Sequence, residues 1–314
     1  MEIEFHYFIT KGIALQAGVN DEQAEIIAHA SQLTDDNVRQ YCINRGKPDE
    51  FRNYISFTYN ILKPRKTLSH IYPIFHFTPG DPDFQGAQRT DRRKSIFNTT
   101  PDSKNANRIL KQSFETGNLY RIGIALHAFA DTWAHQNFIG LYDEFNGMGK
   151  PAPNIGHSDA GNKADYVSVC WHDPRLKKEY QNIDNNQRFL AASQRIFEEL
   201  CLFKGKTKDW FNKKWLSLKG DIAEAFGKPD QNQHLKQQRI QNYKKIFGVD
   251  NRYTKESWLN EAVKSCFPGN HTFKANYAKS HWYLFQKEII KHQDDSYKIL
   301  QSLFEATGQK NEWT

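Results

Sequence analysis

The hydrophobic positions along the chain follow a helical spacing almost throughout. Apolar residues recur every three to four positions wherever the pattern is clear, and the alternation typical of strands is nearly absent. We therefore predict an all-α protein, a multi-helix bundle with a helical C-terminal extension. In the first half of the chain, the pattern predicts helices over residues 20–42, 51–62, 102–115 and 118–138.

Capping and breaking residues mark the ends of these helices. Asn20 followed by Gln23 is typical of a helix start, and Gly117 and Gly140 follow predicted helix ends. Residues 64–102 hold five prolines and 146–162 are rich in glycine and proline, so both stretches are predicted loops. From about residue 185 onward the chain is predicted to be helices separated at glycine and proline positions. We divide it into a core, residues 1–185, and a lysine-rich helical region, 186–314, packed on that core.

The composition indicates a folded globular protein and disfavours membrane-spanning and disulfide-rich classes. The chain has 314 residues, of which 38% are hydrophobic and 14% aromatic, enough for a substantial core. No window approaches the roughly 18 apolar residues of a membrane span, and the start lacks a signal peptide's basic and apolar regions. We expect no transmembrane segment and a location in the cytoplasm, or export by a route that needs no N-terminal signal peptide. The four cysteines are far apart, which disfavours disulfides and a thiolate zinc site.

Positive charge is concentrated in one part of the chain. The formal net charge is +7, and residues 204–245 alone carry eleven Lys and Arg against four Asp and Glu. Such a run could bind a polyanion or an anionic membrane surface. More often, a run of this kind is the solvent-exposed face of a lysine-rich helix.

The segment 118–138 carries the clearest chemistry. At about 100° per residue, His127, Asp131 and His135 fall within about 80° of one another and share one stripe of the helix. No Lys, Arg or Glu lies between Arg121 and Asp143, so Asp131 is predicted to be a buried carboxylate without a cation on its own helix. Burying it unpaired costs several kcal/mol. A divalent cation would compensate the buried charge of Asp131. A His-Asp-His hydrogen-bond network, or an Arg from elsewhere in the chain, would do the same.

Polar residues in apolar surroundings elsewhere could complete a metal cluster. In the helix of residues 20–42, Asp35 shares the apolar face whereas Asp36 lies on the polar side. His6 and His76 lie among aromatics, and His70 competes with His76. A glycine-rich loop adds further candidates, namely His157, Asp159 and Asp165.

The order of these residues resembles the zinc-dependent phospholipase C and single-strand nuclease superfamily, and more closely an uncharacterised bacterial branch. The resemblance covers roughly residues 1–170 and rests on His6, Asp35, His76, then His127-x-x-x-Asp131, with His135 and His157 after them. It implies an all-α fold around a buried His/Asp cluster of two or three Zn²⁺ ions that hydrolyses phosphodiesters. It further implies that the first five are ligands, Asp131 bridging two ions, and that His135 and His157 serve an adjoining site.

The chain departs from that superfamily at two positions. The zinc phospholipases use a mature N-terminal amine as a ligand, whereas this chain begins with Met1 and shows no signal peptide. They also place Glu four residues after the loop histidine, where this sequence has Gly161. Asp159 or Asp165 could substitute for that Glu, or the cluster could hold fewer ions.

The leading hypothesis is a metal-dependent phosphodiesterase, in which Asp131 orients a bridging hydroxide between two divalent ions. Zinc is the expected metal and other divalent metals are compatible. The substrate is an anion, either a nucleic acid or a phospholipid, and the oligomeric state is open. The main alternative is a non-catalytic helical protein with a structural metal and a basic partner-binding surface. An HD-type phosphohydrolase needs an adjacent helical His-Asp pair, and Pro174 directly after His172-Asp173 disfavours a helix there.

Overall fold

The computed structural model describes residues 1–58, 70–149, 154–267 and 269–306. Ten α-helices lie in these ranges: α1 (Thr10–Gln16), α2 (Asp21–Asp36), α3 (Ile71–Phe75), α4 (Lys104–Glu115), α5 (Leu119–Ala134), α6 (Asn185–Phe203), α7 (Lys208–Phe226), α8 (Lys236–Phe247), α9 (Ser257–Ala262) and α10 (His281–Ala306). A π-helical turn, η1 (Glu4–Ile9), runs directly into α1. Short 3₁₀ turns include η3 (Gln85–Ala87), η4 (Glu144–Asn146), η5 (Ser158–Ala164), η6 (Lys178–Tyr180) and η7 (Tyr277–Lys279).

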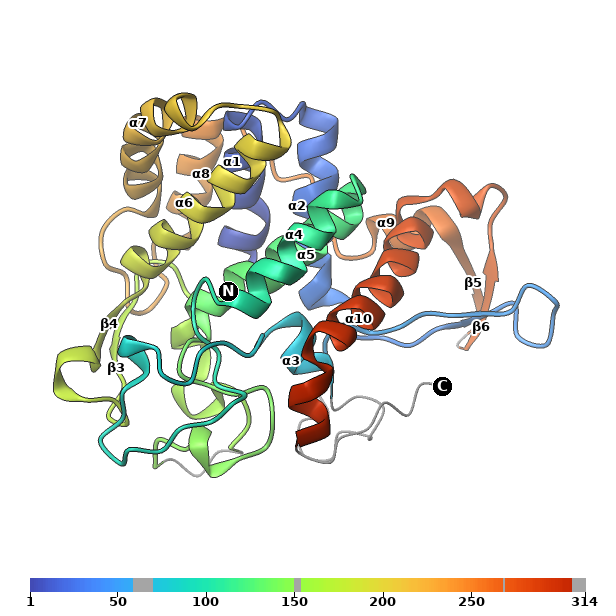
Figure 1. The fold of residues 1–314 in the computed structure, drawn as a ribbon. Helices are drawn as coiled ribbons and strands as arrows, with labels where there is room; N and C mark the ends of the chain where they lie inside the picture. Colours follow the sequence, from blue (N-terminus) through green and yellow to red (C-terminus); the bar gives the residue numbers. More distant parts are fainter. Residues whose placement is uncertain (59–69, 150–153, 268, 307–314) are drawn as a thin grey trace.

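Two small sheets correct the prediction of a strictly all-α fold. One has the strand order β2 (Phe51–Arg52), β1 (Cys42–Ile43), β6 (Asn270–Phe273), β5 (Val263–Phe267), with β1 parallel to β6 and the other pairs antiparallel. The other pairs β3 (Cys170–His172) with β4 (Asn182–Asp184). Strands this short leave little alternation in the sequence, so periodicity did not reveal them. The molecule is mostly helical, with both sheets at its edges (Figure 1).

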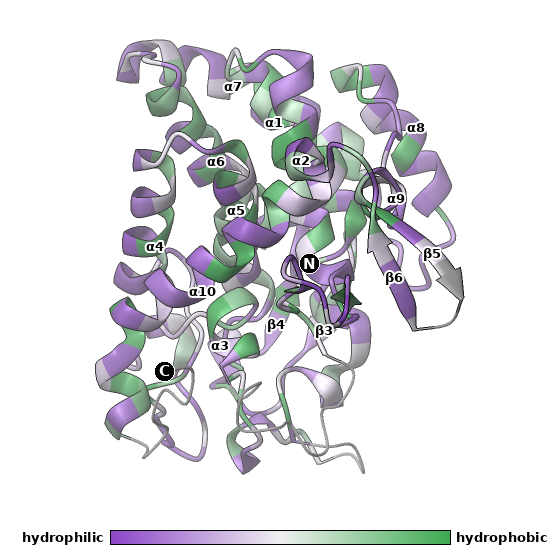
Figure 2. Cartoon of the chain, turned by 90° about the vertical axis from the view of Figure 1, so that its right-hand side faces the viewer, coloured by the Kyte–Doolittle hydropathy of each residue, from purple (hydrophilic) through white to green (hydrophobic). Residues whose placement is uncertain are grey.

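Helix α5 is the buried centre of the molecule. Every residue from Arg121 to Ala134 is buried, as expected for a helix without a solvent face. Asn118 caps its start by accepting hydrogen bonds from the backbone N–H groups of Tyr120 and Arg121. Figure 2 shows hydrophobic residues gathered along inner helices such as α5, whereas α8 at the periphery is largely hydrophilic.

Helix α2 packs closely against α5, and this places Asp35 beside the stripe of His127 and Asp131. At Gly123 a Cβ atom would lie 2.4 Å from the carbonyl oxygen of Ile27 and 2.7 Å from the Cβ of Ala30. Only glycine permits this approach without movement of a helix. The short distance between the two helices therefore depends on this position.

Several predicted boundaries differ from the structure. The first predicted helix ends at Asp36, and residue 42 lies in β1. The predicted helix 51–62 is wrong where it is described, because residues 51–52 form β2 against β1 and residues 59–62 lie outside the described residues. Helix α5 ends at Ala134, so His135 is its C-cap rather than part of its interior.

The N-terminal and C-terminal parts share buried contacts. One hydrophobic core includes residues from Phe5 to Phe304. The buried Glu4 carboxylate accepts two hydrogen bonds from the Arg239 guanidinium, at 2.8 and 2.9 Å, and Arg239 also donates to Asp230 at 2.7 Å. Helix α8 thus holds the π-helical turn that carries His6.

Candidate metal centre

Five side chains from four elements converge at the buried stripe of α5. His6 comes from η1, Asp35 from α2, His76 from the C-cap of α3, and His127 and Asp131 from α5. They form two groups of potential ligands, His6-His127-Asp131 and Asp35-His76-His127, within each of which the ligand atoms lie within 4.8 Å of one another.

The two carboxylate oxygens of Asp131 face different neighbours. Its Oδ1 lies 3.2 Å from Nε2 of His6. Its Oδ2 lies 3.2 Å from Nδ1 of His76, 3.3 Å from Nε2 of His127 and 3.6 Å from Nδ1 of His135. A carboxylate with each oxygen turned to a separate set of nitrogens has the form of a bridging ligand.

A second carboxylate closes the same cluster. Oδ1 of Asp35 lies 3.6 Å from Nδ1 of His76 and 3.6 Å from Nε2 of His127, and its Oδ2 lies 3.8 Å from Nε2 of His6. Burial raises the pKa of Asp35 to about 8, against the opposing effect of His76. This carboxyl group is costly to ionise unless a cation lies beside it.

A third group of potential ligands, His135, His157 and Asp165, adjoins Asp131. His135 Nε2 is 2.9 Å from Oδ1 of Asp165, and His157 Nε2 is 3.2 Å from Oδ2 of the same carboxylate. His157 directly precedes η5 and Asp165 directly follows it, so this short turn sets their spacing. Asp165 is thus the one of the two loop carboxylates that meets the histidines.

Backbone carbonyls orient three of the imidazoles. Nε2 of His76 lies 2.9 Å from the carbonyl oxygen of Ser56, Nδ1 of His135 lies 2.7 Å from that of His76, and Nδ1 of His157 lies 2.8 Å from that of Gly161. Each carbonyl places the ring proton on the nitrogen facing it, so the other nitrogen offers a lone pair to the cluster.

Nitrogen and oxygen lone pairs face one another in the cluster, and this indicates whether the residues fit a metal ion. His76 Nδ1 and His127 Nε2 are only 3.1 Å apart, and both face carboxylate oxygens. Neither ring nitrogen of His6 makes a hydrogen bond within the described part of the chain. Acceptors that face acceptors without water are unfavourable unless a proton or a cation lies between them. The donor set of imidazole nitrogens and carboxylate oxygens fits a divalent ion such as Zn²⁺.

The amino group of Met1 also enters the cluster, a contact that spacing along the chain could not show. It forms a buried ion pair with Asp131 and lies 3.2 Å from Oδ1 of Asp165. Burial opposes its charge, but the neighbouring carboxylates outweigh this and raise the pKa of the amine to about 11. Likewise, burial acts to raise the pKa of Asp131, and the opposing electrostatic effects of His135, of the Met1 amine and of His127 and His6 hold it well below its usual range.

The cluster opens into a cleft of about 460 Å³. Asp35, His157 and Asp165 are partly exposed there, whereas His6 and Asp131 are almost completely buried beneath them. Aromatic and apolar side chains make up much of the cleft lining, namely Phe57, Tyr72, Phe77 and Ile155. The lining residues described all come from positions 1–165, so residues 204–245 contribute none of them.

Three other candidate residues lie outside the groups. Asp36 accepts a hydrogen bond from Tyr253 at 2.7 Å and pairs with Lys255 at 3.0 Å, because it points away from α5. His70 packs against the rings of Tyr297 and Phe304. Asp159 accepts a hydrogen bond from the backbone N–H of Met148 at 2.7 Å.

The His172-Asp173 pair is not helical. His172 ends strand β3, and the buried Asp173 is bound by the guanidinium of Arg175. This arrangement does not match the helical pair that an HD-type site requires.

Of the comparisons with known proteins, only the one with protein families gave a match. No curated protein and no solved structure matches the chain. A family model described as a family of unknown function, DUF6765, matches residues 1–300, which include every residue of the cluster. Because the match extends over nearly the whole sequence, the chain belongs to the DUF6765 family.

Proposed function

We propose that this protein is a metal-dependent phosphodiester hydrolase, with zinc as its metal. The observation that carries the proposal is the placement of Asp131 beneath an open cleft, with Oδ1 facing His6 and Oδ2 facing His76 and His127. Two or three divalent ions bound there would supply Lewis-acid stabilisation and a water with a lowered pKa. The resemblance to the zinc phospholipases and single-strand nucleases points to the same chemistry.

In this proposal the chain's own residues have separate tasks. His6, Asp35, His76, His127 and Asp131 would hold ions at the two inner groups, and His135, His157 and Asp165 would hold one at the adjoining site. The carbonyl oxygens behind His76, His135 and His157 keep these rings in place, which limits reorganisation during turnover. The aromatic walls exclude water around the reacting phosphate and strengthen its electrostatic interactions with the cluster.

The substrate class is an anionic phosphodiester, either a nucleic acid or a phospholipid head group. A cleft with charged ligands at its base and aromatic residues along its walls suits a phosphate joined to an apolar or flat group. No helix among the described residues is long and apolar enough to cross a bilayer.

A mutation with a matched control tests the hydrolase. Asp131→Asn should reduce hydrolysis of bis(p-nitrophenyl) phosphate by roughly a hundredfold or more, since the amide keeps the shape but loses the charge facing the cations. The control pair is Asp35→Asn and Asp36→Asn on α2. These carboxylates are adjacent in sequence, but only Asp35 faces the cluster.

We expect Asp35→Asn to impair hydrolysis and Asp36→Asn to retain it, with circular dichroism checking that each variant is folded. Chelation should abolish the wild-type rate, and added Zn²⁺ should restore it. Wild-type protein loaded with zinc that shows no hydrolysis of this diester, of single-stranded DNA or of phospholipid would favour the alternative of a structural metal.

A further inference from the structure

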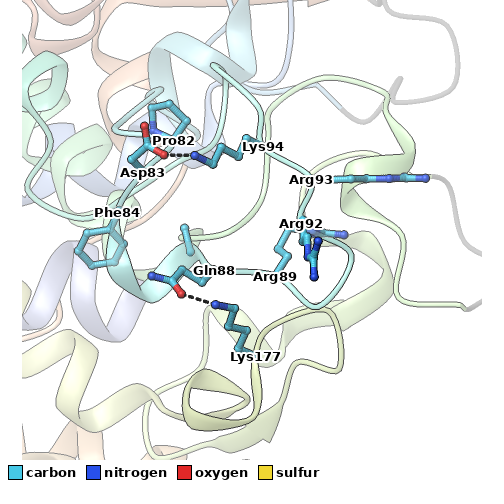
Figure 3. Close-up of a pocket in the computed structure, with 10 residues that line it drawn as sticks. Pro82, Asp83, Phe84, Gln88, Arg89, Arg92, Arg93, Lys94 and Lys177 are labelled. Carbon is cyan, nitrogen blue, oxygen red and sulfur yellow. Dashed lines mark hydrogen bonds and ion pairs between the residues drawn. The ribbon is translucent and has the colours of Figure 1, made fainter.

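A second pocket, separate from the cleft, has positive charge on five of its ten lining residues. It has a volume of about 220 Å³ and shares no lining residue with the cleft of the metal centre. Its cationic lining residues are Arg89, Arg92, Arg93, Lys94 and Lys177, and Asp83 is the one carboxylate among the lining residues described. Figure 3 shows these side chains coming from the loop around η3 and from the segment before η6. We call it the basic pocket.

Backbone hydrogen bonds join the two segments that form the basic pocket. The N–H of Thr90 donates to the carbonyl oxygen of Arg175 at 2.9 Å, and the N–H of Lys177 donates to that of Gln88 at 2.9 Å. Residues nearly 90 positions apart in sequence are therefore fixed side by side. These bonds fix the backbone of the pocket, whereas the side chains of Arg92 and Lys177 are exposed.

Arg89 forms part of the frame and does not offer a free charge. Its guanidinium is buried and binds both carboxylate oxygens of Asp91, at 2.9 and 2.8 Å, and it also donates to the carbonyl oxygen of Phe145 at 3.0 Å. These bonds use three of its five N–H donors, and the Asp91 carboxylate compensates its charge.

The remaining ion pairs leave two cations uncompensated. Lys94 pairs with Asp83, and Arg93 lies 3.9 Å from Asp91 and 3.8 Å from Glu144. Within the described part of the chain, Arg92 and Lys177 pair with no carboxylate, and Lys177 donates instead to the amide oxygen of Gln88 at 2.7 Å. The basic pocket thus carries two positive charges without acidic partners.

The backbone at Arg92 is strained. Its φ angle is +60°, in the left-handed region that costs a non-glycine residue roughly 1–2 kcal/mol. Surrounding structure must hold such a conformation, and strained residues cluster at binding sites. The strain here falls on one of the two unpaired cations.

We propose that the basic pocket binds the phosphate group of a small anionic molecule, a phosphate monoester or a diphosphate. A phosphate dianion matches the two uncompensated charges, with the planar guanidinium of Arg92 and the ammonium of Lys177 as its partners. The volume admits the phosphate together with a small attached group, and the ring of Phe84 provides an apolar wall (Figure 3). This site does not depend on the hydrolase activity.

Calorimetric titration with pyrophosphate tests the proposal. We compare wild type with the double variant Arg92→Gln/Lys177→Gln and with the control Lys178→Gln, whose exposed side chain does not line the pocket. Because a metal centre can also bind pyrophosphate, Asp131→Asn is included. The double variant should bind at least about tenfold more weakly, since each removed partner is a charge-assisted hydrogen bond. The Lys178 variant should bind as wild type does, and Asp131→Asn should retain the part of the binding that the double variant loses.

Three results would overturn the proposal. Wild type and the double variant could bind equally, wild type could fail to bind, or binding could be lost in Asp131→Asn alone, which would assign it to the metal centre. A short single-stranded oligonucleotide provides a further arm. If it binds through Arg92 and Lys177 whereas pyrophosphate does not, the ligand is a nucleic acid strand and the small-anion proposal is wrong.

Discussion

Asp131 shows how far single residues could be interpreted from the sequence. Its stripe with His127 and the lack of cations on its own helix identified it as a buried carboxylate, and it is 1% exposed. His135 was placed on the same helix, but it caps that helix and its Nε2 faces Asp165. The choice between Asp159 and Asp165 could not be made from sequence, because the direction of a side chain on a glycine-rich loop depends on tertiary contacts.

The group of His135, His157 and Asp165 should hold a separable ion. We predict that His135→Ala lowers the zinc content by about one equivalent and reduces hydrolysis less than Asp131→Asn does, because His135 belongs to the group with His157 and Asp165. Metal analysis of the two variants side by side measures this. Loss of all bound zinc in His135→Ala would show that the cluster is one indivisible site.

His292 should make stability sensitive to acid. Burial, followed by the charges of Arg121 and His127, holds the pKa of His292 well below its usual range, and neither ring nitrogen has a hydrogen-bond partner within the described residues. The unfolded state, with a pKa of about 6.5, then binds a proton that the folded state does not. The stability that the neutral imidazole of His292 contributes is fully present above about pH 6.5. It is lost as the pH falls towards the pKa of His292 in the folded state.

Urea denaturation at several pH values tests this effect. Below about pH 6.5, the free energy of unfolding of His292→Leu should fall by up to about 1.4 kcal/mol less per pH unit than that of wild type. The exposed His234→Leu serves as control and should retain the wild-type slope. Parallel curves for wild type and His292→Leu would assign the acid sensitivity to other groups.

Among the elements, the long helices of the first half were predictable, whereas the strands and the short helix α3, which lies in a predicted loop, were not. The predicted starts at residues 20, 102 and 118 are correct to within two residues for α2, α4 and α5. The structure shows Asn20, Ser103 and Asn118 as their caps, each accepting a hydrogen bond from the first turn. The helical entry segment and the strands β1 and β2 were missed. These strands have two residues each and exist through pairing with each other and with distant β6, which local periodicity cannot reveal.

The contact between α2 and α5 should couple packing to metal binding. Gly123→Ala is expected to cost about 1–3 kcal/mol of stability, because its Cβ would contact the backbone of Ile27. It should also weaken zinc binding, since α2 carries Asp35 and α5 carries His127. Gly220→Ala on α7 is the control. Its Cβ has nothing within 4 Å, so it should stabilise the protein by about 1 kcal/mol.

Thermal unfolding with and without zinc separates the two effects. A Gly123→Ala variant as stable as wild type would contradict the close packing of the two helices. A destabilised variant with unchanged zinc affinity would show that the position of Asp35 does not depend on the packing of α2 against α5 at Gly123.

At the scale of the whole molecule, the cluster is assembled from distant segments. His6 lies on a turn held by Arg239 of α8, and the buried Arg121 of α5 donates to Asp295 of α10 at 2.7 Å. The predicted division at residues 185 and 186 therefore separates regions that share a core. The lysine-rich stretch lies largely on α7 and α8 outside the cleft lining, so the structure provides no direct contact between it and a bound substrate.

Elemental analysis of the purified protein is the most direct test of the metal cluster. We predict two or three equivalents of zinc per chain in the wild type, a loss of at least one in Asp131→Ala, and no loss in Asp36→Ala, whose carboxylate lies outside the cluster. A folded wild-type protein that contains no divalent metal, and that binds none when zinc is added, would contradict it.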